Sequence, residues 1–255
     1  MAVIIKTDRE LDAMRAGGKI HARILRLVSE KVSPGISTGE LDQYAESLCR
    51  EFGCIPAFKG YQPAGQDTPF PATICTSIND EIVHGIPSID RILQNGDIIS
   101  IDLGIQYDGV FLDGAVTVPV GTVSKQVLQF INDTREALAV GIAAAQPGAT
   151  TGDVGYAIQH FVNKRYGIVK GLAGHGVGRE IHEDPFVPNY GKPGQGTPLV
   201  PGMTIAIEPM LTMENPATDL LDDDWTFVTS DGSLAAHCEH TIIITPHGPE
   251  IVTIE

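Results

Sequence analysis

Hydrophobic residues recur with helical spacing near the start of the chain, after two polar motifs that are typical of helix starts. Thr7 and Glu10 form a capping box, which predicts a helix that continues to about Val28. Ser37 and Glu40 repeat this motif and predict a second helix. The apolar face of that second helix is expected to carry Leu41, Ala45, Leu48 and Phe52.

The second half of the chain has the same two-helix pattern. Ser124 is the expected start of a helix that ends near Pro147, and another helix follows it. Each of these helices has apolar residues at the spacing of one helix face. They are Val127, Ile131, Leu138 and Ile142 in the first, and Val154, Ile158, Phe161 and Val162 in the second.

A repeated motif joins the two helices of each half. Residues 34–41 read PGISTGEL, and residues 147–154 read PGATTGDV. In both halves the second helix is expected to stop at an aromatic residue followed by glycine, Phe52 in one and Tyr166 in the other. Two copies are too few for a stacked repeat array, so the motif indicates a two-fold internal duplication.

Runs of β-branched and apolar residues follow the helices and predict strands. Residues 97–106 and 110–120 flank Tyr107-Asp108-Gly109, which is typical of a hairpin turn. Further strands are expected over residues 203–212, 237–245 and 250–254. Two helices and a hairpin in each half predict an α+β fold with a mostly antiparallel sheet.

The two related halves, about residues 1–120 and 121–255, are expected to form a single domain, because no Ser/Gly-rich linker separates them. Their pseudo-two-fold relation predicts a cleft at the boundary between them. A chain of this length can bury a substantial hydrophobic core.

Composition excludes several classes of protein. Lys and Arg number 17 against 32 Asp and Glu, and the net charge of −15 argues against nucleic acid as a general partner. No apolar run approaches the roughly 20 residues of a membrane helix, and the N-terminus lacks the pattern of a signal peptide. Four cysteines without a CxxC pair predict buried free thiols, which suit a reducing cytoplasm.

Carboxylates stand at positions where apolar residues are expected. Asp102 interrupts the β-branched run of residues 98–104, and Asp113 lies in the returning strand of the predicted hairpin. The turn would bring these two side chains near each other across the hairpin. Two neighbouring buried carboxylates need a cation, or one of them must keep a proton.

The second half shows the same anomaly. Glu208 ends one apolar strand and Glu239 begins another, and glycines flank His175. Any one of these residues alone would more often be a surface or salt-bridged side chain. Together, four strand-borne carboxylates and one imidazole suit Mn²⁺, Fe²⁺, Co²⁺ or Zn²⁺, and two ions balance the charge better than one. The glycines around His175 lack the βα context of a dinucleotide-binding motif.

These residues occur in five stretches that resemble the methionine aminopeptidases, whose pita-bread fold is shared with prolidase and aminopeptidase P. The close spacing of Glu208 and Glu239 matches the short, bacterial-style type I enzymes, because it leaves no room for the helical insertion of type II. The resemblance covers nearly the whole chain. The five stretches are residues 77–87, SINDEIVHGIP; Ile101-Asp102 with Asp113; residues 174–178 with His182-Glu183; residues 207–210, IEPM; and residues 239–241, EHT.

The resemblance implies removal of the initiator methionine from nascent proteins, with a small second residue preferred. It implies two divalent ions per chain, of which Asp113 and Glu239 would bind both. His84 and His182 would contact the substrate, and Glu208 would also act as the general base. The metal ligands implied are Asp102, Asp113, His175, Glu208 and Glu239. The expected protein is a cytoplasmic monomer, in transient proximity to the ribosome.

The resemblance also implies an apolar pocket for the methionine side chain, which Phe58, Tyr61, Cys75 and Trp225 would line. For Phe58 and Tyr61 an ordinary core position is an equally good interpretation. Residues 61–73 are longer than the matching segment of common bacterial members, and Gly104 stands where a threonine is frequent.

Two other functions are compatible with the same fold. One is an X-Pro peptidase similar to prolidase or aminopeptidase P. The other is a non-catalytic protein that binds peptides. The complete ligand set argues against the second, and the absence of a matching extra N-terminal domain argues against the first.

Overall fold

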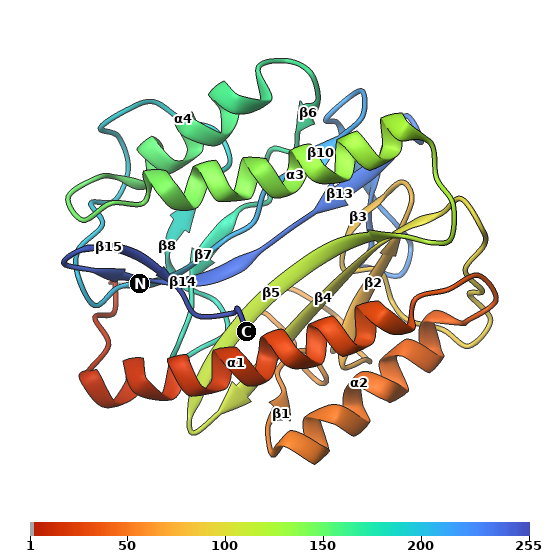
Figure 1. The fold of residues 1–255 in the computed structure, drawn as a ribbon, viewed down its shortest axis with the longest axis horizontal. Coiled ribbons are helices and arrows are strands. Elements are labelled where there is room, and N and C mark those ends of the chain that lie inside the picture. The colour runs from red at the N-terminus through yellow and green to blue at the C-terminus, as the bar shows by residue number, and fades with distance from the viewer. Residues whose placement is uncertain (1–2) are drawn as a thin grey trace.

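A computed structural model describes residues 3–255, in which four helices pack around several small antiparallel sheets. The helices are α1 (Asp8–Lys31), α2 (Thr38–Phe52), α3 (Lys125–Ala144) and α4 (Thr151–Val162). Figure 1 shows α1 beside α2 and α3 beside α4, with the long strands β4, β5 and β14 between the two pairs. This pairing is the one expected from the repeated motif.

Side-chain caps start all four helices. The predicted capping boxes at Thr7 and Ser37 are present, and Ser124 caps α3 by accepting a hydrogen bond from the amide of Val127. Thr150, which belongs to the repeated motif, forms a third box with Asp153 at α4. The caps at Thr7, Ser37 and Ser124 are local in sequence and were predicted correctly, whereas the box at Thr150 was not predicted.

The helix ends were predicted less well. Gly53 takes a left-handed conformation with φ of 72° and ends α2, as expected. The prediction that the fourth helix continues to Tyr166 is wrong. α4 ends at Val162 because Asn163 and Lys164 adopt positive φ angles, which break the helical hydrogen bonding.

The strands form four sheets, and all neighbouring strands among the described residues are antiparallel. In the first half the sheet contains β1 (Ile55–Pro56), β4 (Ile98–Tyr107), β2 (Ile74–Ile78) and β5 (Val110–Pro119). The five-stranded sheet of the second half has the order β15 (Gly248–Ile251), β14 (His240–Thr245), β9 (Thr204–Ile207), β7 (Gly174–Gly176) and β8 (Glu183–Val187).

Two three-stranded sheets complete the fold. One has the order β13 (Ala235–His237), β10 (Met210–Thr212) and β6 (Gly167–Ile168). The other has the order β11 (Thr218–Leu220), β12 (Phe227–Thr229) and β3 (Glu81–Val83). The short strands of these sheets were not predicted, because two or three residues carry too little pattern.

Two of the predicted strands are interrupted. Residues 203–212 form β9 and then β10, with a break at Glu208 and Pro209, since proline has no amide hydrogen to donate. Residues 237–245 are divided in the same way, between β13 and β14. Because β9 pairs with β14 and β10 with β13, the two breaks lie opposite each other.

The hydrophobic core has two main parts, one under each helix pair. The first packs α1 and α2 against the first sheet, and the second packs α3 and α4 against β9 and β14. None of the helices in residues 3–255 has the length and apolar character needed to cross a membrane. Fully buried side chains of the two parts include Met14, Ile24, Leu41, Ile101 and Leu103 in the first, and Phe130, Ile158, Ile205 and Ile242 in the second.

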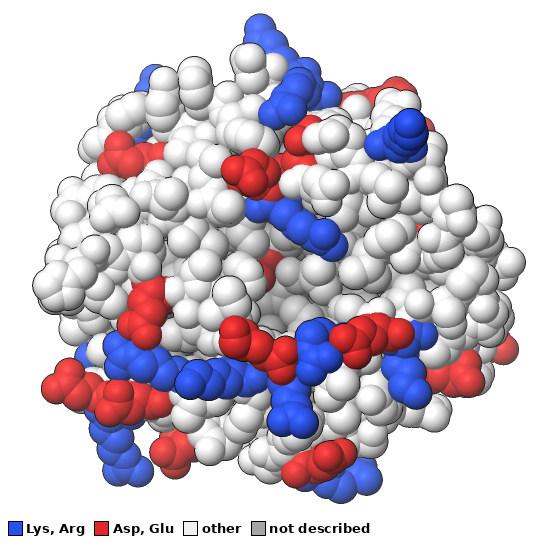
Figure 2. Space-filling model, viewed as in Figure 1, with Lys and Arg blue, Asp and Glu red and all other residues white. Residues whose placement is uncertain are grey.

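Ion pairs tie α1 to the C-terminal residues. Arg15 binds Glu250 at 2.8 Å, and Arg26 binds Glu255 at 2.5 Å and Glu30 at 2.8 Å. Figure 2 shows acidic and basic side chains interspersed along the lower part of this face, where α1 lies in Figure 1. These pairs are exposed, so each contributes little to stability.

A different ion pair, between Lys6 and Glu183, is buried. The side chains are 1% and 3% exposed, and the ammonium group donates a hydrogen bond to the Glu183 carboxylate. The other oxygen of Glu183 accepts hydrogen bonds from the amides of Arg179 and Glu180. The pair therefore holds the residues before α1 against the loop that contains His182.

We expect Lys6→Met to destabilise the protein by about 3–5 kcal/mol, because it leaves the Glu183 carboxylate buried without its cation. Urea unfolding would measure the loss. The double variant Lys6→Met/Glu183→Gln removes both charges and should recover a large part of it. A Lys6→Met variant as stable as the wild type would contradict this account.

Candidate metal centre and active site

The hairpin of β4 and β5 positions the first two carboxylates. Asp108 and Gly109 form its turn with φ angles of 47° and 81°, so the strands stay in register up to the tip. Asp102 is opposite Ala115 and Asp113 is opposite Gly104, which makes the two aspartates diagonal neighbours. They are only 8% and 3% exposed.

The two strand breaks position the other two carboxylates. Glu208 follows β9, and Glu239 precedes β14, so each stands where the chain passes from one sheet to another. The backbone of Glu239 also exchanges hydrogen bonds with Ala115 on β5, at 2.9 and 3.3 Å. The acidic residues of the two halves therefore meet at the boundary between them.

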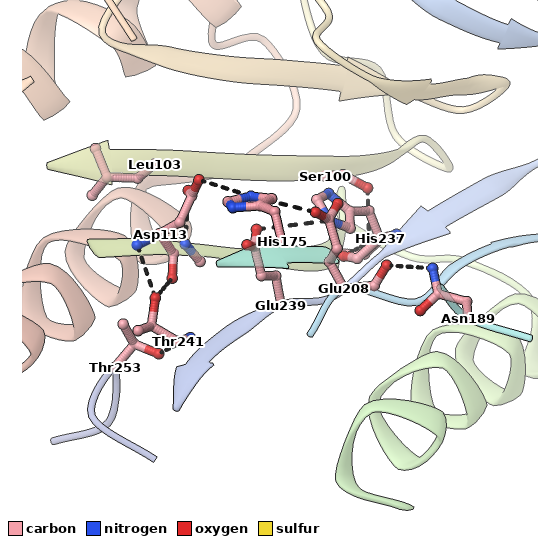
Figure 3. A network of polar contacts seen from close by, with 12 residues as sticks. Ser100, Leu103, Asp113, His175, Asn189, Glu208, His237, Glu239, Thr241 and Thr253 are labelled. Carbon is pink, nitrogen blue, oxygen red and sulfur yellow. Dashed lines mark hydrogen bonds and ion pairs between the residues drawn. The ribbon is translucent and has the colours of Figure 1, made fainter. Parts of the chain in front are cut away.

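His175 lies in β7 and joins this acidic group. Its Nε2 atom is 3.6 Å from Oε1 of Glu208 and 3.9 Å from Oδ2 of Asp113, and Figure 3 shows these side chains pointing toward one another. Nδ1 lies 2.8 Å from the carbonyl oxygen of Gly176, an acceptor that orients the ring. Nε2 is thereby left to face the carboxylates.

Ligand atoms in the cluster lie close enough to hold metal ions. Three groups have all their ligand atoms within 4.8 Å of one another, and two of them contain Glu239. One of these two adds Asp102 and Asp113, and the other adds His175 and Glu208, whereas the third group joins Asp113 and His175 to His182. Oδ1 of Asp102 and Oε1 of Glu239 are buried without a hydrogen-bond partner. Buried carboxylate oxygens in this state need a cation, so the donor set fits a pair of divalent ions.

The pKa values of the clustered carboxylates and of His175 also indicate a cation-binding site. Burial, followed by the negative charges of neighbouring carboxylates, raises the pKa values of Asp113 and Glu239 well above their usual range. Burial also raises the pKa of Asp102 to about 7. Burial lowers the pKa of His175 to about 4, so its imidazole is neutral and able to bind a cation.

Sequence analysis missed His237, which lies beside the cluster. Its Nε2 atom is 3.3 Å from Oε2 of Glu208 and 3.8 Å from Oε2 of Glu239, and the residue is 1% exposed. Burial lowers its pKa, but the hydrogen bond and charge of Glu208 outweigh this effect, and the pKa is raised. The sequence did contain a signal for His237. It lies two residues before Glu239, and in an extended chain residues two apart point to the same side.

A cavity of about 290 Å³ opens beside the cluster. All eleven residues that the sequence indicated for the site line this cavity, together with four that it did not indicate. The eleven are Phe58, Tyr61, Cys75, His84, Asp102, Asp113, His175, His182, Glu208, Trp225 and Glu239, and the four are Pro63, Gln66, Phe70 and Phe227.

Aromatic rings form the apolar end of the cavity. Phe70 packs edge-on against Trp225 at 5.2 Å and against Phe58 at 6.4 Å between ring centroids. His84 lies 6.2 Å from Trp225, and burial lowers its pKa to about 4, so its ring is neutral. Such a lining suits an unbranched apolar side chain.

The unusual segment 61–73 contributes to this lining through a non-local contact. The side-chain amide of Gln66 donates a hydrogen bond from Nε2 to the backbone carbonyl of Asp224 at 3.0 Å. The amide of Phe70 donates to the carbonyl of Tyr61 at 2.8 Å, which closes the segment on itself. Because its path depends on these contacts, sequence alone did not indicate Gln66 or Phe70.

The family model of Metallopeptidase family M24 matches residues 12–246. The chain belongs to this metallopeptidase family. The match includes both halves of the duplication and all five clustered ligand residues. The resemblance seen in the sequence is therefore confirmed at the level of the family.

Methionine aminopeptidases are similar to this chain over their whole length. The chain is 45% identical to a methionine aminopeptidase of Clostridium acetobutylicum over 253 residues, which covers 99% of each. A crystal structure of methionine aminopeptidase from Thermotoga maritima matches with a TM-score of 0.95 and 40% identity over 100% of both chains. A prolidase from Pyrococcus horikoshii matches with a TM-score of 0.76 and 24% identity, over 99% of this chain and 64% of the prolidase. These matches confirm the predicted α+β pita-bread fold.

The raised carboxylate pKa values predict a pH dependence of stability. Without metal, Asp113 and Glu239 keep protons in the folded state at pH values where the unfolded state has lost them, and Asp102 does so up to about pH 7. The free energy of unfolding should therefore fall as pH rises from 6.5 to 8.5, by about 1.4 kcal/mol per pH unit for each extra proton. Urea unfolding of chelator-treated protein measures this slope. Added Mn²⁺ should flatten it, and a stability that rises with pH in metal-free protein would contradict the prediction.

The contact between Gly104 and Phe58 gives a second prediction. A Cβ atom at position 104 would lie 2.6 Å from Cε1 of Phe58, so the ring occupies the space of a larger residue. Gly104→Ala should displace the ring and destabilise the protein by about 1–3 kcal/mol. In a double-mutant cycle, Phe58→Ala should remove this added cost. If Gly104→Ala lowers the free energy of unfolding equally in the wild type and in Phe58→Ala, the Phe58 ring is not the group that clashes with the added methyl group.

Proposed function

We propose that this protein is a methionine aminopeptidase, which hydrolyses the bond after an N-terminal methionine when the second residue is small. The observation that carries the proposal is the junction of the five-residue ligand cluster with the aromatic-lined cavity of about 290 Å³. The similarity to methionine aminopeptidases over their full length supports it.

In this proposal Asp102, Asp113, His175, Glu208 and Glu239 hold two divalent ions. Asp113 and Glu239 would contribute to both ion sites, as the resemblance to methionine aminopeptidases implies, and Glu239 belongs to both of the close ligand groups that contain it with the other proposed ligands. Co²⁺, Mn²⁺, Fe²⁺ and Zn²⁺ all accept such a mixture of carboxylate oxygens and one imidazole nitrogen. When bound, paired ions activate water and polarise a carbonyl group.

The cavity would receive the methionine side chain. Phe58, Phe70 and Trp225 offer ring edges and faces, which make favourable contacts with a thioether sulfur. Cys75, buried in β2 opposite Asp102, lies where the apolar surface meets the carboxylates. An N-terminal methionine would thus lie with its side chain among the rings and its backbone at the cluster.

The proposed catalytic residues surround that backbone. His182 would donate a hydrogen bond to the oxygen of the scissile carbonyl as negative charge develops there. His84, whose ring is neutral, would contact the nitrogen of the scissile amide. Glu208 would accept the proton of the attacking water.

We also propose that the protein acts as a monomer in the cytoplasm, on nascent chains close to the ribosome. All four cysteines are free and buried, which supports a reducing compartment.

The direct test is release of methionine from a Met-Gly-containing peptide. Chelation should abolish release, and Co²⁺ or Mn²⁺ should restore it, because the buried carboxylates require the cations. A parallel assay with an X-Pro dipeptide separates the prolidase-like alternative. Faster hydrolysis of the X-Pro substrate would support that alternative, and no hydrolysis of either peptide after metal return would support a non-catalytic binding protein.

A matched variant excludes a contaminating peptidase as the source of activity. His84→Ala keeps all five ligands but removes the ring beside Trp225, and should lower kcat by about 10²–10⁴-fold. Urea unfolding controls for loss of the fold. Unchanged kcat in a folded variant would remove His84 from the scheme.

A further inference from the structure

Tyr61 makes a contact that a pocket-lining role does not require. Its hydroxyl lies 2.8 Å from Nδ1 of His182, and the two rings are 5.2 Å apart. A ring nitrogen of His182 also lies within 4.8 Å of ligand atoms of Asp113 and His175. Because Nδ1 faces Tyr61, Nε2 is the nitrogen available to the acidic cluster.

We propose that Tyr61 is a positioning residue that holds His182 in the tautomer with its proton on Nε2. A neutral imidazole has one N–H group and one lone pair. A phenol hydroxyl is a better hydrogen-bond donor than acceptor, and an unprotonated imidazole nitrogen is a strong acceptor, so the contact with Tyr61 favours the tautomer whose Nδ1 carries no proton. When the Tyr61 hydroxyl donates a hydrogen bond to Nδ1, the imidazole proton lies on Nε2, which faces the acidic cluster.

Hydrogen bonds hold the backbone of Tyr61 on both sides. The amide of Tyr61 donates to the carbonyl of Phe58, and the carbonyl of Tyr61 accepts from the amide of Phe70, both at 2.8 Å. Within residues 3–255 the Tyr61 hydroxyl has a single hydrogen-bond partner, His182. His182 is therefore the only group in the described part of the chain to which this hydroxyl donates.

Two contacts position His182, one through its backbone and the other through its ring. Glu183, held by Lys6 and by the amides of Arg179 and Glu180, fixes the backbone next to His182. The ring can still rotate about its side-chain bonds, and Tyr61 restrains that rotation. A donor with a fixed proton and a fixed direction needs no rearrangement when charge develops.

The catalytic consequence rests on the proposed function. A preset Nε2–H group would be ready to donate to the scissile carbonyl oxygen, and without Tyr61 both tautomers would be populated. We expect Tyr61→Phe, which keeps the ring, to lower kcat about 10-fold, less than the full loss of such a donor. KM should stay within about two-fold, because the apolar lining is preserved.

The tautomer itself can be measured without substrate or metal. Long-range ¹H–¹⁵N spectra of histidine-labelled, metal-free protein at neutral pH distinguish the two tautomers, and His182→Ala identifies the signals. We expect Nε2–H in the wild type and a shift toward Nδ1–H in Tyr61→Phe. Tyr156→Phe, on the exposed surface of α4, is the matched control; it stacks on His160 and should leave the His182 signals unchanged. An Nδ1–H wild type, or no change in Tyr61→Phe, would overturn the proposal.

Kinetics of the metal-loaded enzyme provide the second arm. In a His182→Ala background, Tyr61→Phe should cost no further turnover. An equal loss in both backgrounds would show that Tyr61 acts through the pocket rather than through His182. A wild type that releases no methionine would refute the proposed function, whereas the spectra would still decide the tautomer.

Discussion

The carboxylates of Asp102, Asp113, Glu208 and Glu239 meet where solvent has little access. The strands of both halves hold these four like charges close together against their mutual repulsion. Two negative charges 4 Å apart repel each other by about 4 kcal/mol at the effective dielectric constant of a protein. Protons relieve this repulsion in the metal-free protein, and divalent cations relieve it more completely. Because Asp102 and Asp113 come from one half and Glu208 and Glu239 from the other, cations at this point would also join the halves.

Sequence was most informative where structure depends on neighbours along the chain. The capping boxes at Thr7 and Ser37 and the hairpin around Asp108 were predicted correctly, because each is determined within a few residues. The carboxylates were recognisable for a related reason, since a charged residue within a β-branched run stands out without knowledge of its partners.

Sequence was least informative where structure depends on distant partners. The break at Pro209 turns one apparent strand into two because β9 and β10 pair with different neighbours. His237 gains its significance only from its distance to Glu208. Phe70 enters the cavity because segment 61–73 closes on itself and is held at Asp224, a contact that no local pattern encodes.

The buried pair of Lys6 and Glu183 has a consequence for the order of assembly. Its partners are 177 positions apart in the chain, so during synthesis the lysine leaves the ribosome long before the glutamate exists. The loop that carries His182 can take its final shape only after that late pairing. A chain that ends before Glu183 therefore lacks the ordered loop of His182, and because Glu208 and Glu239 follow later still, the acidic cluster is complete only near the end of translation.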